Sequence, residues 1–130
     1  MKTQLIFNEN NLFQGDEIKV VFVCSVGMLR SPTAARIASK YKINARSCGS
    51  DIKIALIPIN KNLIEWADKI VFMNSKNYSQ ILKNENFDSH FLDLVNKKSL
   101  IWHINDDYNY MQKSLIDELN LYFKRDFTNV

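Results

Sequence analysis

The chain has 130 residues, of which 46% are hydrophobic and 24% charged, and its formal net charge is +3. This length suits a single domain with one hydrophobic core, and the composition excludes disordered and fibrous proteins. The positive charge is small and dispersed, so it indicates no nucleic-acid partner, whereas a small anionic ligand remains compatible with it.

The sequence contains two cysteines. It shows no secretory signal and no apolar run long enough to span a membrane. These features indicate a reducing compartment, and we expect a cytoplasmic protein with free thiols and no membrane partner. Residues 1–16 are polar and rich in Asn, and we interpret them as an N-terminal arm. The domain is then expected at residues 17–130.

The first predicted element is a strand at Ile18–Val23, a nearly continuous run of apolar and β-branched residues. Such a run is typical of a strand buried on both faces of a parallel sheet. A helix is expected soon after it, with Ser31 as N-cap and Pro32 at the first helical position. Apolar residues then follow at helical spacing, namely Ala34, Ile37, Ala38 and Tyr41.

Strands and helices are expected to alternate along the rest of the chain. Further strands are predicted at 45–48, 69–73 and 99–104, and helices at 60–67, around Tyr78, Ile81 and Leu82, and at 113–125. The last helix has an apolar side formed by Leu115, Ile116, Leu119, Tyr122 and Phe123. This order predicts a single-domain α/β fold, with a parallel sheet covered by helices on both faces.

One segment carries the chemistry: Cys24 at the end of the first strand, and Arg30 at the mouth of the next helix. The carboxyl ends of parallel strands are where open α/β sheets bind ligands. Backbone N–H groups in the connecting turn, the helix dipole and the Arg30 fork would together hold a phosphate. The same field favours thiolate over thiol at Cys24, and the Ser31 hydroxyl can hydrogen-bond the sulfur. The segment therefore predicts a phosphate-binding loop with a cysteine nucleophile.

A purely structural Cys24 is the alternative. An arginine six residues after a cysteine arises by chance in many proteins, so the spacing alone is weak evidence. The buried strand directly before the loop and the helix start directly after it favour the functional interpretation.

Four segments in order resemble the motifs of the low-molecular-weight protein tyrosine phosphatases. They are residues 21–24 with 30–34, Ser47-Cys48-Gly49-Ser50, residues 67–73, and Ile104-Asn105-Asp106-Asp107-Tyr108. The resemblance implies a four-stranded parallel sheet and hydrolysis of phosphotyrosine through a phosphocysteine intermediate. It also implies that neither a metal nor a cofactor takes part, and that the substrate is a phosphotyrosine protein or an aryl phosphate.

The resemblance also implies roles for residues. Cys24 would be the nucleophile, Arg30 the phosphate clamp and Asp106 the general acid, with Asp107 where the family usually has proline. The expected substrate-binding residues are Ser25, Val26, Gly27, Met28, Leu29, Ser31, Tyr108 and Tyr110. The two tyrosines would flank a flat aromatic substrate, or one of them would cap the core instead.

The chain also departs from the family. Gly27 stands where Asn is usual, Leu29 replaces a second cysteine, and the segment after Gly49 lacks an aromatic wall, so we expect a shallow cleft. A phosphate-binding or phosphotyrosine-binding module with little turnover is therefore one alternative. An arsenate reductase on the same scaffold is another, but its cysteine relay would have only Cys48, which we interpret as a core residue.

Overall fold

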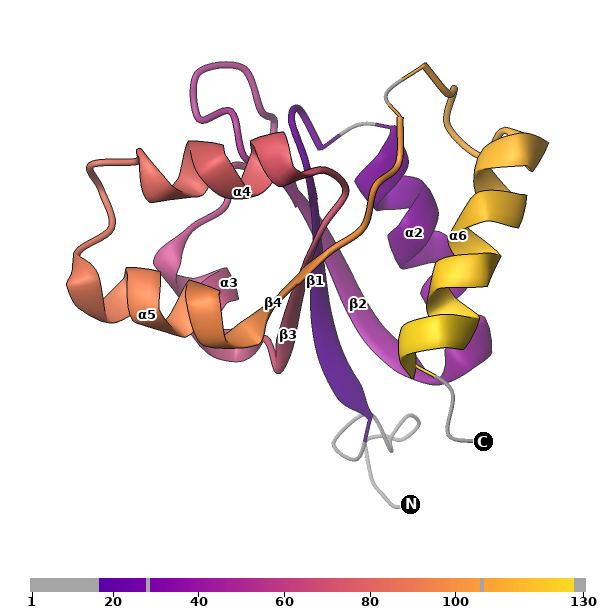
Figure 1. Ribbon diagram of the computed structural model, residues 1–130, viewed down its shortest axis with the longest axis horizontal. Coiled ribbons are helices and arrows are strands. Elements are labelled where there is room, and N and C mark those ends of the chain that lie inside the picture. The colour runs from indigo at the N-terminus through magenta and orange to yellow at the C-terminus, as the bar shows by residue number, and fades with distance from the viewer. Residues whose placement is uncertain (1–16, 28, 106, 128–130) are drawn as a thin grey trace.

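The computed structural model describes residues 17–27, 29–105 and 107–127 (Figure 1). The predicted arm at residues 1–16 and the predicted site residues Met28 and Asp106 lie outside the described residues. The elements follow in the order β1 (Ile18–Cys24), α2 (Arg30–Ala38), the 3-10 helix η2 (Ser39–Tyr41), β2 (Ile43–Gly49), α3 (Lys61–Trp66), β3 (Lys69–Phe72), α4 (Ser75–Leu82), α5 (Ser89–Lys98), β4 (Ser99–Ile101) and α6 (Lys113–Phe127). No helix in the described part of the chain has the length and apolar character needed to cross a membrane.

The four strands form one sheet in the order β2-β1-β3-β4, and every neighbouring pair is parallel. This confirms the predicted four-stranded parallel sheet. Cys24 pairs with Gly49 of β2, and Val23 pairs with Phe72 of β3, so the three strands end at the same edge. The loops that follow them meet there, which is the usual ligand-binding edge of such a sheet.

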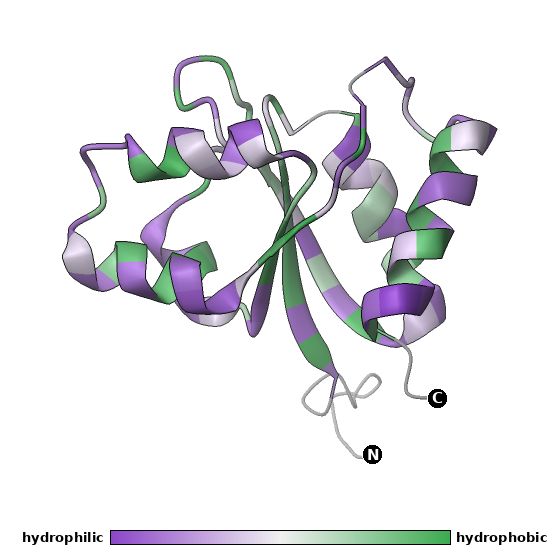
Figure 2. Ribbon diagram, viewed as in Figure 1, coloured by the Kyte–Doolittle hydropathy of each residue, from purple (hydrophilic) through white to green (hydrophobic). Residues whose placement is uncertain are grey.

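Helices cover both faces of the sheet, as predicted: α2 and α6 lie on one side, and α3, α4 and α5 on the other (Figure 1). The alternation of side chains along β1 supplies both cores, since Val20 and Phe22 pack with α2 and α6, while Val21 and Val23 pack on the opposite face. Hydrophobic residues run along the central strands, whereas the helices carry both hydrophobic and hydrophilic segments (Figure 2).

The core under α6 is aromatic. Phe22, Trp102 and Phe123 are fully buried, and their ring centroids lie 5.1–5.8 Å apart in tilted and edge-on arrangements. Such geometries add to the stabilisation that burial of the rings provides. This cluster fixes α6 against β1, and through α6 it fixes the loop between β4 and α6.

Helix α5 was not predicted from the sequence. It begins after Asp88, whose side chain accepts a hydrogen bond from the Phe91 N–H, and it packs beside α3. At its end, the Lys98 Nζ donates to the carbonyl oxygens of Ile64 at 2.7 Å and Glu65 at 3.3 Å, close to the carboxyl end of α3. Burial lowers the pKa of Lys98, while the neighbouring carboxylates oppose that shift.

Two expectations about element ends were wrong. Helix α2 begins at Arg30, and Leu29, not Ser31, occupies the N-cap position. Ser31 is fully buried because its hydroxyl faces β1 and β2, so it is unavailable as a cap. Strand β4 ends at Ile101, although Trp102 and Ile104 still donate backbone hydrogen bonds along β3. Leu82, which the sequence placed on one helix face with Tyr78 and Ile81, is 45% exposed at the end of α4.

Candidate active site

Cys24 ends β1 with its side chain buried beneath the loop that leads to α2. Its Sγ lies 3.1 Å from the Ser31 Oγ and accepts a hydrogen bond from the Gly27 N–H at 3.2 Å. The Ser31 hydroxyl also lies within donating distance of the Cys48 carbonyl oxygen, at 3.3 Å. Because a hydroxyl has one hydrogen, Ser31 can donate to that carbonyl when Cys24 is a thiol, and to the sulfur when Cys24 is a thiolate.

The loop is braced by the segment after β2. The Ser50 N–H donates to the Cys24 carbonyl at 2.8 Å, and the Asp51 N–H donates to the Ser25 carbonyl at 2.9 Å. Gly27 has a φ of +81°, and a Cβ there would lie 2.9 Å from the Cys48 carbonyl carbon. Glycine meets both demands at this position, since it adopts positive φ freely and has no Cβ.

Arg30 is the first residue of α2 and is only 6% exposed. Its Nη1 donates to the Ile104 carbonyl oxygen at 2.8 Å, which joins the start of α2 to the segment after β4. A guanidinium has five N–H donors, so several remain for a ligand. The Thr33 hydroxyl makes a second connection, since it donates to the Leu29 carbonyl at 2.7 Å and accepts from the Met111 N–H at 3.0 Å.

A small pocket of about 110 Å³ opens at the carboxyl edge of the sheet. Its lining comes from the loops after β1, β3 and β4 and from the first turns of α2 and α4, and consists of Ser25, Arg30, Asn74, Lys76, Asn77 and Asn105. Arg30 and Lys76 are cationic, and no carboxylate belongs to this described lining. Two larger cavities of 620 and 630 Å³ are not lined by any described residue of the β1–α2 loop. The small pocket thus combines two cationic side chains with Ser25, the residue that follows Cys24.

The predicted tyrosines lie away from this pocket. Tyr108 is half-buried against the α2–α6 core, and its hydroxyl donates to the Glu118 carboxylate at 2.7 Å, which raises the pKa of Tyr108. Tyr110 is 47% exposed and lines a separate cavity over α2, together with Pro32 and Arg36. Val26 lies in the loop and is partly buried, while Leu29 is 40% exposed.

The two cysteines are free, and their environments differ. Cys48 is 1% exposed, and burial, together with the nearby Cys24, raises its pKa well above the ordinary thiol value. Cys24 packs in the core under α2 and α6, whereas Cys48 packs in the core on the opposite face. Cys48 therefore stays a protonated core thiol, as the sequence indicated.

Sequence reasoning missed the contribution of α4. Asn74 follows β3 and caps α4, and its neighbours Lys76 and Asn77 line the pocket. The polar segment directly after a buried parallel strand was the available signal, because strand ends in one sheet share an edge.

No protein-family model and no curated protein sequence matches the chain. Solved structures do match. SP-PTP, a low-molecular-weight protein tyrosine phosphatase from Streptococcus pyogenes, gives a TM-score of 0.60 at 16% identity, covering 86% of this chain and 95% of that chain. The tyrosine phosphatase Wzb from Escherichia coli K30 gives 0.59 at 18% identity, with coverages of 82% and 94%. The YwlE arginine phosphatase from Geobacillus stearothermophilus gives 0.52 at 16% identity, with coverages of 87% and 99%.

At these identities the likeness concerns the fold. It extends over nearly the whole of each matched structure, and it includes the parallel sheet with helices on both faces. The chain therefore has the fold of the low-molecular-weight protein tyrosine phosphatases, which confirms at the level of fold the resemblance carried by its sequence motifs.

Proposed function

We propose that the protein is a phosphomonoester hydrolase of the protein tyrosine phosphatase type, acting through a phosphocysteine intermediate. The observation that carries this proposal is the environment of Cys24, whose sulfur lies between the Ser31 hydroxyl and the Gly27 N–H at the base of a loop closed by Arg30. The Gly27 N–H donates to this sulfur and the Ser31 hydroxyl lies within donating distance of it, so both can hydrogen-bond a thiolate, which is the nucleophilic form.

In the proposed reaction, the Cys24 thiolate attacks phosphorus, so that an S–P bond forms as the P–O bond to the leaving group breaks. Arg30 and the loop amides hold the equatorial oxygens, whose charge must be stabilised in the transition state. Asp106 protonates the leaving oxygen. It then removes a proton from the water that hydrolyses the S–P bond, which releases phosphate and restores the thiolate.

The charge of the pocket favours phosphotyrosine over phosphoarginine. Proteins of both activities share this fold, and the Wzb structure is a complex with phosphate. Arg30 and Lys76 are the charged groups among the described lining residues. A phenolic leaving group carries no positive charge, whereas a guanidinium leaving group would be repelled by these cations.

The alternatives are distinguishable from this proposal. A binding module would bind phosphate without hydrolysing phosphate esters. An arsenate reductase would need a reactive relay thiol, and the raised pKa and burial of Cys48 disfavour that role.

The decisive test is hydrolysis of p-nitrophenyl phosphate by the wild type and by Cys24→Ser, with and without EDTA. We expect metal-independent turnover by the wild type and none by the variant, while both bind tungstate, because the loop and Arg30 persist. Rapid acid quench of the wild type should trap a phosphorylated Cys24. Equal turnover by the two proteins would refute the covalent mechanism, and tungstate binding without wild-type turnover would support the binding module.

A second experiment tests the acid. Asp106→Asn should lower kcat by roughly a hundredfold for aryl phosphates with poor leaving groups and less for activated ones, because only the former need a proton. Asp107→Asn is the matched control and should have a mild effect. A larger, leaving-group-dependent loss in Asp107→Asn would move the assignment to that residue, and no such loss in either variant would exclude a general acid here.

A further inference from the structure

Asn77 is a buried polar residue that the proposed reaction does not use. It lies in the first turn of α4, is fully buried, and lines the phosphate pocket. Its Nδ2 donates to the Ser25 Oγ at 3.0 Å and to the Ser50 Oγ at 3.2 Å. One amide group thus connects α4 to the phosphate loop and to the segment that follows β2.

Counting hydrogens shows what this contact does. Both Nδ2 hydrogens are used on hydroxyl oxygens, so Ser25 and Ser50 each accept a bond and keep their own hydrogen for donation. Ser50 donates its hydrogen to the Gln80 Oε1. No described residue accepts the hydrogen of Ser25, and Ser25 lines the pocket. The hydroxyl of Ser25 is therefore a free donor at the place where the anion would bind.

One feature of this hydrogen-bond network is energetically unfavourable, which supports a functional reason for it. The Asn77 Oδ1 is buried and has no hydrogen-bond partner within the described residues. Buried polar groups without partners are rare and destabilising, so each requires an explanation. Exchanging the positions of Oδ1 and Nδ2 in the Asn77 side chain would leave the two Nδ2 hydrogens unpaired. It would also direct the Ser25 hydrogen at Asn77, away from the pocket.

We propose that Asn77 is a positioning residue that, supported by Ser50 and Gln80, turns the Ser25 hydroxyl toward the pocket so that it donates to a phosphate oxygen. The inference rests on the proposed function and extends it: the phosphate is held by a side-chain hydroxyl as well as by loop amides and Arg30. Because Ser25, Ser50, Asn77 and Gln80 do not titrate in the working range, this donor acts independently of pH.

The test is a double-mutant cycle of Ser25→Ala and Asn77→Ala, with kcat/KM for p-nitrophenyl phosphate and Kd for inorganic phosphate as the two readouts. Each single variant should lose about tenfold in kcat/KM and severalfold in phosphate affinity, and the double variant should lose no more than either single one. The shape of the pH profile should be unchanged. A multiplicative loss in the double variant, or no loss in Ser25→Ala, would overturn the proposal.

Two further variants test the proposal if Asn77→Ala does not fold. Asn77→Asp has the same shape but accepts where Asn donates, so it should capture the Ser25 hydrogen and weaken phosphate binding; unchanged binding would contradict the proposal. Ser25→Thr keeps the hydroxyl and should retain more activity than Ser25→Ala, and equal losses would count against it. Asn84→Ala, at another buried asparagine, is the control for a purely structural effect and should change stability without changing kcat/KM.

The phosphate affinities separate this inference from the proposed function. If the wild type binds phosphate but has no turnover, the proposed hydrolase activity fails, and the cycle in phosphate affinity still decides the role of Asn77. If turnover is present and the two substitutions are independent, the hydrolase stands and the positioning role fails.

Discussion

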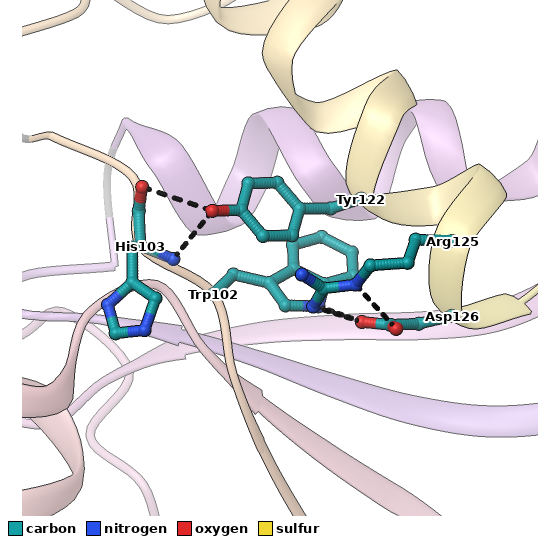
Figure 3. A network of polar contacts seen from close by, with 5 residues as sticks. All are labelled: Trp102, His103, Tyr122, Arg125 and Asp126. Carbon is teal, nitrogen blue, oxygen red and sulfur yellow. Dashed lines mark hydrogen bonds and ion pairs between the residues drawn. The ribbon is translucent and has the colours of Figure 1, made fainter.

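Two polar networks lie at different places in this fold, and they differ in whether their polar atoms are paired. One joins the segment after β4 to the end of α6 (Figure 3). The other lies beneath the phosphate loop and consists of Ser25, Ser50, Asn77 and Gln80. The first has the character of a structural anchor, and the second that of a site prepared for a ligand.

The anchor is centred on Trp102, which is fully buried. Its Nε1 donates to the Asp126 Oδ2 at 2.7 Å, and the same carboxylate accepts two bonds from Arg125, at 2.9 and 2.8 Å. Beside them, the Tyr122 ring stacks on Trp102 at 5.2 Å, and its hydroxyl accepts from the His103 N–H. Both carboxylate oxygens and the indole N–H are thus paired, as is usual for buried polar groups.

The loop network differs because one of its atoms, the Asn77 Oδ1, has no described partner, and because Ser25, whose hydrogen no described residue accepts, lines the pocket. The unpaired amide oxygen lowers stability, and the unpaired hydroxyl remains available as a donor to a ligand. The contrast leads to a general expectation: substitutions of side chains that line the pocket should affect activity more than stability, and substitutions in the anchor should do the reverse.

The largest effect expected from this comparison is that of Arg30→Lys on activity. A single ammonium cannot both donate to the Ile104 carbonyl and match two phosphate oxygens, so we expect kcat/KM to fall by about a hundredfold, or roughly 2.7 kcal/mol of barrier. Thermal denaturation should show a much smaller change. Arg36→Lys, on an exposed turn of the same helix, is the control and should be neutral. A loss of less than about tenfold would show that Arg30 does not clamp the transition state.

The sequence was sufficient for the parts of the fold that carry local patterns. Apolar runs identified β1 and β3, and helical periodicity identified α2 and α6. Helix α5 has an Asp88 cap and an apolar side, but its burial depends on docking against α3, which no local pattern expresses. Ser31 was wrongly predicted as the N-cap of α2. The capping propensity of serine cannot show that this hydroxyl contacts the sulfur of Cys24 instead.

The same distinction holds for the candidate site. Cys24 and Arg30 were found because strand, loop and helix are consecutive in the sequence. Asn77 is separated from Ser25 by 52 residues and from Ser50 by 27. Isolated Asn and Ser residues have no periodicity, so only the shared edge of the parallel strands brings them together.

The second prediction concerns Gly27 in the loop between β1 and α2. Gly27→Asn should destabilise the protein by about 2 kcal/mol, because any Cβ there meets the Cys48 carbonyl carbon at 2.9 Å and the Gly49 nitrogen at 3.0 Å. Gly27→Ala should lose about 1 kcal/mol more, since Ala tolerates the φ of +81° less well than Asn does. Chemical denaturation of the wild type and the two variants measures both losses of stability. An Asn variant as stable as the wild type would show that the loop yields to the Cβ.

The smallest expected effect is that of Asp126→Asn, and it tests the anchor. The hydrogen bonds from Arg125, and after them the bond from Trp102, lower the pKa of Asp126, whereas burial opposes the shift. A carboxyl group whose pKa is lower in the folded than in the unfolded protein stabilises the fold above its unfolded value of about 3.9, and this contribution is lost as the pH falls through the folded value.

Near pH 7, Asp126→Asn should therefore cost about 1 kcal/mol, a modest value because the Arg125 side chain is 59% exposed and its ion pair is screened by solvent. The stability difference between the two proteins should shrink as the pH is lowered below about 4, because protonation removes the charge of Asp126 in the wild type as well. Denaturation curves between pH 2.5 and 7 measure this difference, and kcat/KM at pH 7 should be unchanged because no anchor residue lines the phosphate pocket. A constant difference across this range would mean that the anchor depends on the shape of the side chain and not on its charge.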